Sequence, residues 1–146
     1  MKIILKLCAA VVLATAPMSA PALAQDLPSA AAHNPLFEPL LPLVGKTWRG
    51  KAVGQEGVED IMRWDWAIGG HALRARHAVN GGAYGGETLV FPDKDSETLV
   101  FHYFTSGGFH TTGTIKPQPD GSLLIEETVH GAEGIETLRT VARFDA

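Results

Sequence analysis

The chain has 146 residues, a single cysteine and a formal net charge of −4. This length suits one domain, and a lone cysteine excludes an internal disulfide framework, so apolar burial must stabilise the fold. An acidic surface is a poor partner for nucleic acid or anionic lipid. The composition therefore argues against both of those binding classes.

Residues 1–24 have the order of a secretory signal peptide. Lys2 and Lys6 come first, an apolar run follows, and the small-residue site Ala22-Leu23-Ala24 ends the segment. That order is typical of a cleaved export signal. The apolar run is roughly half of the ~20 residues that span a bilayer, so we expect no membrane span. The sequence predicts a periplasmic or secreted protein.

Cleavage after residue 24 would divide the chain into three parts. Cys8 and two positive charges would leave with the signal, so the mature chain would contain no cysteine and would be still more acidic. Residues 25–33 are small and polar and predict a flexible leader. Residues 34–146 would then form a single domain.

A short helix should open this domain. Asn34 followed by Pro35 is typical of a helix cap and first turn, and Pro39 and Pro42 should stop the helix from growing. Its apolar side chains could plug one end of a hollow fold: Leu36, Phe37, Leu40 and Leu41.

Glycine-rich turns separate period-two runs from residue 46 onward, which is typical of strands. The predicted strands are 46–53, 58–68, 71–79, 86–92, 97–105, 109–116, 122–130 and 135–144. Short loops between successive strands favour an all-β, antiparallel, up-and-down barrel of about eight strands.

The turn at Gly69-Gly70 predicts which side chains share a face. Opposed residues of an antiparallel hairpin point to the same side of the sheet. We expect an outer ion pair between Asp65 and Arg74, which oppose each other there. The inner face should carry Met62, Trp64, Trp66, Leu73 and His77.

The same rule assigns the two faces of one later hairpin but not those of another. The loop 131–134 places Glu126 opposite Arg139 outside, and Glu127 inside. In the hairpin 97–116 both faces are apolar, so the inward face stays open. One predicted set is Leu99, Phe101, Tyr103, His110 and Thr112; the other is Val100, His102, Phe104, Phe109 and Thr111.

Asp60 and His77 are candidates for acid–base chemistry. They should lie diagonal to each other on the inner face, where a carboxylate could orient an imidazole as a general base requires. The alternative is that both simply meet solvent at the rim. Trp64 and Trp66 likewise could form an aromatic wall for a ligand or could be ordinary core residues.

The histidines predict no metal centre. His71 and His77 share a face but should lie about 20 Å apart along the strand. His102 and His110 are expected on opposite faces, so no three-ligand zinc cluster forms. We expect no metal and no cofactor, although a single inward histidine leaves haem binding open.

A family resemblance rests on several segments between residues 40 and 144. The stretch Leu43-Val44-Gly45-Lys46-Thr47-Trp48-Arg49-Gly50 resembles the Gly-x-Trp opening of calycin-type barrels, with one extra residue before Trp48. Gly69 to Arg74, Tyr84 to Leu89 and Phe101 to Phe104 resemble exported bacterial calycin-like proteins of a domain-of-unknown-function family in the lipocalin and nitrobindin neighbourhood.

The resemblance implies a fold and no established activity. Of the nitrobindin-like haem fingerprint only Trp48-x-Gly50 is present, so no haem ligand carries over. Related barrels continue for one or two further strands. Either this barrel closes with eight strands or the chain is a member incomplete at its C-terminus with an open edge, and we favour the second.

These observations favour an exported barrel that holds a small apolar or amphipathic molecule. The alternatives are an enzyme that uses Asp60 and His77 in the same cavity, a haem-binding barrel, and a structural protein with a filled core. Neither ligand identity nor oligomeric state follows from the sequence. The predicted ligand-binding residues are Met62, Trp64, Trp66, Leu73, His77, Tyr103 and Glu127.

Overall fold

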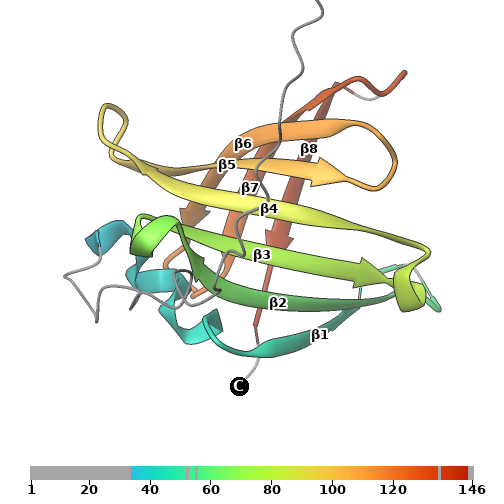
Figure 1. Cartoon of the computed structure of the whole chain (residues 1–146), viewed down its shortest axis with the longest axis horizontal. Helices are drawn as coiled ribbons and strands as arrows, with labels where there is room; N and C mark the ends of the chain where they lie inside the picture. Colours follow the sequence, from blue (N-terminus) through green and yellow to red (C-terminus); the bar gives the residue numbers. More distant parts are fainter. Residues whose placement is uncertain (1–33, 52, 55, 135, 145–146) are drawn as a thin grey trace, which may run out of the picture.

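A computed structural model describes residues 34–51, 53–54, 56–134 and 136–144. The predicted signal peptide and leader lie outside the described residues. The described chain forms one antiparallel sheet of eight strands in sequence order, curled into a half-barrel (Figure 1). The all-β, up-and-down prediction is therefore confirmed. The strands are β1 (Thr47–Lys51), β2 (Glu59–Ala67), β3 (Ala72–Val79), β4 (Tyr84–Asp93), β5 (Thr98–Thr105), β6 (His110–Pro117), β7 (Leu123–His130) and β8 (Thr137–Ala142).

The two outer strands of the sheet, β1 and β8, do not pair within the described residues. The curl nevertheless brings the two edges towards each other, because β7 and β8 run behind β3 and β4 (Figure 1). The rings of Trp48 on β1 and Phe144 after β8 meet edge-to-face, with centroids 5.4 Å apart. The two edges are thus joined by side chains and not by a backbone ladder.

A 3₁₀ helix, η1 (Pro35–Leu43), covers one end of the concave face. The Asn34 side chain accepts a hydrogen bond from the Leu36 amide at 2.9 Å, as the predicted cap requires. Phe37, Leu40 and Leu43 are buried in the core. The helix therefore closes this end as predicted.

Two details of the predicted helix are wrong. Pro39 and Pro42 lie inside η1 and do not end it. The tight 3₁₀ form suits short stretches in which proline has already fixed the backbone φ angle. Leu41 is 41% exposed, because it falls on the side of η1 that faces away from the sheet.

The β2–β3 hairpin has the predicted register. Trp64 opposes Ala75 and Met62 opposes His77. Two short 3₁₀ turns, η2 (Ile68–Gly70) and η3 (Asn80–Gly82), flank β3. The expected Asp65–Arg74 ion pair is replaced, because the Asp65 carboxylate contacts the side chains of Arg63 at 3.0 Å and Arg76 at 3.4 Å.

The β5–β6 hairpin resolves the open question of its inner face and corrects both proposed sets. Its loop has three residues, so Tyr103 opposes Thr111 and Phe104 opposes His110. A pairing of odd-numbered with even-numbered residues would need a loop of even length. The inner face carries Leu99, Phe101, Tyr103, Thr111 and Ile115, which are buried or partly buried.

The outer face of the same hairpin carries the histidines that were expected on opposite faces. His102 and Phe104 stack at 6.4 Å, and Phe104 stacks on His110 at 6.1 Å. His102 and His110 therefore share the outer face. The loop length accounts for this error too, since it sets the parity of the whole pairing.

Candidate functional site

The concave face of the sheet encloses a cavity of about 140 Å³ that is partly open to solvent. It lies beyond the part of the face that η1 covers, and most of its wall is apolar. Four polar side chains line it, those of His77, Thr88, Tyr103 and Glu127. The other lining residues are Met62, Trp64, Ala75, Phe101, Ile115 and Ile125.

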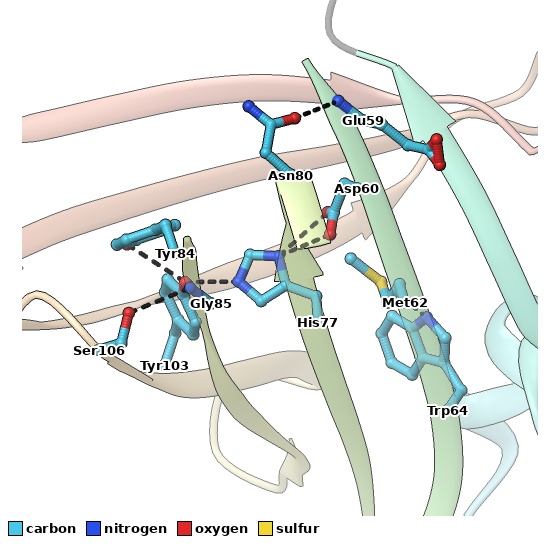
Figure 2. A network of polar contacts seen from close by, with 10 residues as sticks. All are labelled: Glu59, Asp60, Met62, Trp64, His77, Asn80, Tyr84, Gly85, Tyr103 and Ser106. Carbon is cyan, nitrogen blue, oxygen red and sulfur yellow. Dashed lines mark hydrogen bonds and ion pairs between the residues drawn. The ribbon is translucent and has the colours of Figure 1, made fainter. Parts of the chain in front are cut away.

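A chain of hydrogen bonds runs along one side of this cavity (Figure 2). Nδ1 of His77 lies 3.0 Å from Oδ2 and 3.2 Å from Oδ1 of Asp60. Its Nε2 contacts the hydroxyl of Tyr103, which lies 3.2 Å from the hydroxyl of Tyr84. The Asp60 carboxylate accepts from Nδ1–H of His77, so Nε2 is the ring nitrogen that faces the Tyr103 phenol.

The strand register explains why these groups meet. Asp60 is displaced from His77 by two positions across the β2–β3 pair, which is the diagonal spacing of same-face neighbours. On the other side of β3, Gly86 directly opposes His77. A side chain at Gly86 would collide with the ring of Tyr103. The missing side chain therefore lets that ring lean across β4 to reach His77.

The Tyr103 hydroxyl is held in its neutral form. Burial raises the pKa of Tyr103, and the hydrogen bond to Tyr84 and the negative charges of Asp60 and Glu127 raise this pKa further. A phenol that keeps its proton can donate a hydrogen bond at neutral and moderately alkaline pH.

Glu127 supplies a carboxylate on another part of the cavity wall. Its Oε2 accepts a hydrogen bond of 2.7 Å from the hydroxyl of Thr111, whose side chain is almost fully buried. This agrees with the predicted inward orientation of Glu127. Its sequence neighbour Glu126 faces outward and bonds Lys116 at 2.8 Å.

The structure separates the predicted ligand-binding residues into two groups. Met62, Trp64, His77, Tyr103 and Glu127 line the cavity. Leu73 is fully buried in the core, and Trp66 packs edge-to-face on Phe37 with centroids 5.4 Å apart. These two residues share the concave face but lie outside the cavity wall. Asp60 reaches the cavity only through His77.

Sequence reasoning missed Tyr84, Gly86 and Thr111, which support the polar groups of the site. Tyr84 was assigned to a turn, whereas β4 begins at this residue. Thr111 was placed in the wrong set of the β5–β6 hairpin. The predicted ligand-binding residues also lacked five residues of the cavity wall: Ala75, Thr88, Phe101, Ile115 and Ile125.

No group of three or more histidine, cysteine or acidic residues is positioned to hold a metal ion in the described part of the chain. The ring nitrogens of His77, the histidine on the cavity wall, are both engaged by Asp60 and Tyr103. Among residues 34–144, apart from the three that are not described, no helix is long and apolar enough to cross a membrane.

The chain was compared with models of known protein families, with characterised proteins and with solved structures, and none of the three comparisons finds a match.

Proposed function

We propose that this protein is an exported, calycin-like binding protein that holds a small apolar or amphipathic molecule on the concave face of its half-barrel. The observation that carries the proposal is the cavity itself. An apolar wall with a few convergent polar groups is the usual composition of a small-molecule site. Those polar groups are supplied by His77, Thr88, Tyr103 and Glu127.

The size of the cavity limits its occupant. A void of about 140 Å³ is close to the ~150 Å³ that accommodates benzene in an apolar protein interior. The enclosed part of the ligand is therefore about one ring in size. Because the cavity is partly open, a larger molecule could place one end inside and leave the rest in solvent.

Export is proposed from the sequence of residues 1–24 alone. Native mass spectrometry of protein recovered from the exported fraction of expressing cells tests both parts of the proposal. We expect a species that starts at Gln25 and carries the additional mass of a bound molecule. The same spectrum would identify a haem by its mass.

A variant that fills the cavity, compared with a control variant on the outer face, tests whether the cavity is the binding site. Ala75 is buried in the cavity wall, so Ala75→Leu should occupy the space and abolish binding of benzyl alcohol, read from tryptophan fluorescence. Ala78→Leu makes the same change on the outer face of β3 and should leave binding intact. The proposal is wrong if the unmodified protein carries no mass and gives no response to benzyl alcohol.

A second function is supported by the hydrogen-bond chain, namely an enzyme that moves a proton to or from the bound molecule. In this reading, Asp60 orients His77, His77 acts as the base, and Tyr103 relays the proton from the bound molecule to Nε2 of His77. The contacts of His77 with both neighbours favour this reading.

The variant His77→Ala distinguishes the binding function from the enzymatic one. If the protein is an enzyme, His77→Ala abolishes conversion of the molecule identified by mass spectrometry while the molecule still binds. If binding and conversion disappear together, or if the unmodified protein returns the molecule unchanged, His77 serves binding alone.

A further inference from the structure

We infer that the cavity selects small aromatic molecules that carry a protonated amine, with the ammonium group bound by the Glu127 carboxylate. This inference rests on the binding function proposed above and names its ligand class. It is carried by the contacts of Glu127, by the charges around the cavity and by its aromatic wall.

Glu127 lines an apolar cavity without a cationic partner. Its hydrogen bond from Thr111 uses Oε2, and among the described residues no lysine, arginine or histidine contacts its carboxylate. Lys116, the lysine of the same hairpin, pairs with Glu126 on the outer face. An ionised carboxylate accepts several hydrogen bonds, so Glu127 keeps unused acceptor capacity inside the cavity.

The charges around the cavity favour a cation over an anion. No lysine or arginine lines it, and His77, its one imidazole, is already bonded to Asp60. The charges of Asp60 and Glu127 both act on the Tyr103 hydroxyl between them. A carboxylate ligand would meet like charge here, whereas an ammonium group would meet its counter-ion.

The rest of the wall suits an aromatic ring beside that cation. Trp64, Phe101 and Tyr103 line the cavity, and aromatic faces attract a nearby ammonium group. The enclosed volume of about 140 Å³ admits one ring. The carboxylate, the aromatic wall and the volume of the cavity therefore favour an arylalkylamine as the ligand over a fatty acid or a phosphate ester.

Three probes of similar size and different charge test the inference on the protein as it is recovered from expressing cells. Benzylamine is a cation at neutral pH, benzyl alcohol is neutral, and benzoate is an anion. We expect benzylamine to bind about tenfold more tightly than benzyl alcohol, since a hydrogen bond between charged groups is worth this much, and benzoate to bind most weakly. Tryptophan fluorescence titration measures all three.

Glu127→Gln should remove the preference while preserving the cavity. The amide oxygen can still accept from Thr111, so benzyl alcohol should bind as before and benzylamine should weaken about tenfold to the same level. Glu126→Gln removes one charge from the adjacent outward position. In that variant the preference for benzylamine should persist, which separates a local contact from the net charge of the protein.

The outcomes distinguish this inference from the binding function on which it rests. If benzylamine and benzyl alcohol bind equally, or if Asp60→Asn removes the preference and Glu127→Gln does not, the assignment to Glu127 is overturned while the cavity remains a binding site. If no probe binds, the proposed function itself fails.

Discussion

The two ends of the concave face are built from the same strands and differ in what covers them. At one end η1 lays Phe37 and Leu40 onto Trp66 and Leu73, and these side chains are nearly inaccessible or packed against the core. At the other end no helix of the described residues covers the sheet, and Asp60, His77 and Tyr103 occupy the corresponding positions. One end is a filled core and the other is a cavity.

The difference shows how a single strand, β3, can contribute one side chain to the filled core and another to the cavity. On β3, Leu73 and His77 point to the same side, with one inward position, Ala75, between them. Burial under η1 is favourable for the leucine, whereas an imidazole needs the hydrogen bonds that Asp60 and Tyr103 supply. The extent of η1 therefore sets where the core ends and the candidate site begins.

The largest expected effect comes from opening the filled end. Phe37 is 1% exposed, so Phe37→Ala should lower the free energy of unfolding by about 3–5 kcal/mol, from lost burial and the void left behind. Chemical denaturation measures this change. Leu41→Ala, on the exposed side of the same helix, should cost well under half as much.

Measuring the affinity of the Phe37→Ala protein for benzyl alcohol tests whether the two ends of the concave face are independent. If the two ends are independent, the folded fraction of the Phe37→Ala protein should still bind benzyl alcohol with unchanged affinity. A parallel loss of affinity would mean that η1 also shapes the cavity, and the comparison of the two ends would have to be abandoned.

An intermediate effect is expected from Gly86→Ala at the open end. The new methyl group would collide with the Phe104 carbonyl and the Tyr103 ring, so we expect a loss of about 1–3 kcal/mol in unfolding free energy and displacement of Tyr103 from His77. Denaturation together with the tyrosine titration described next measures both effects.

Gly50→Ala is the matched control for this change. Gly50 also lies on a strand, and a methyl group there would come no closer than 3.8 Å to Asp60, which is ordinary contact. Its stability and its tyrosine titration should stay close to those of the unmodified protein. Equal damage in both variants would contradict the role assigned to Gly86.

The smallest expected effect is a loss of stability at alkaline pH. Burial raises the pKa of Tyr103 in the folded protein above the ordinary tyrosine value of 10.0, so above pH 10 the folded state keeps a proton that the unfolded state releases. Stability should therefore fall as the pH rises past 10. The tyrosinate absorbance of the unmodified protein minus that of Tyr103→Phe should show this tyrosine ionising late. Ionisation near pH 10 in the folded protein would argue against a buried, bonded phenol.

The sequence was sufficient for the β2–β3 hairpin, because tryptophans and charges alternate there and only one register places them on separate faces. The contact between Asp60 and His77 follows from that register. The β5–β6 hairpin was different, because aromatic side chains occur on both faces and the three-residue loop had to be counted correctly. Thr111 was therefore not assigned to the cavity, and Tyr103 was named as a ligand-binding residue without its face being known.

The sequence pattern also did not predict that Gly86 on β4 lies opposite His77. Glycine gives no face preference, so nothing in Tyr84-Gly85-Gly86 indicated that β4 begins at residue 84. The extent of η1 was also predicted incorrectly, since Pro39 and Pro42 were expected to stop the helix whereas the 3₁₀ form contains both and continues to Leu43. Trp66 and Leu73 were expected to meet a ligand because they share the inner face of the hairpin with Met62 and Trp64.

The contact between Trp48 and Phe144, which forms a side-chain seam between the β1 and β8 edges, bears on how the proposed ligand would enter the cavity. A space of about 310 Å³ at this seam is lined by Trp48, Phe144, Asp60 and Met62, and Met62 also lines the inner cavity. Parting the two edges breaks one edge-to-face contact of about 0.5–1.5 kcal/mol, whereas a closed barrel would have to break a ladder of hydrogen bonds, each of similar net worth. Under the proposed binding function, this seam is therefore the place where the two sheet edges can separate without breaking a strand ladder of the described sheet.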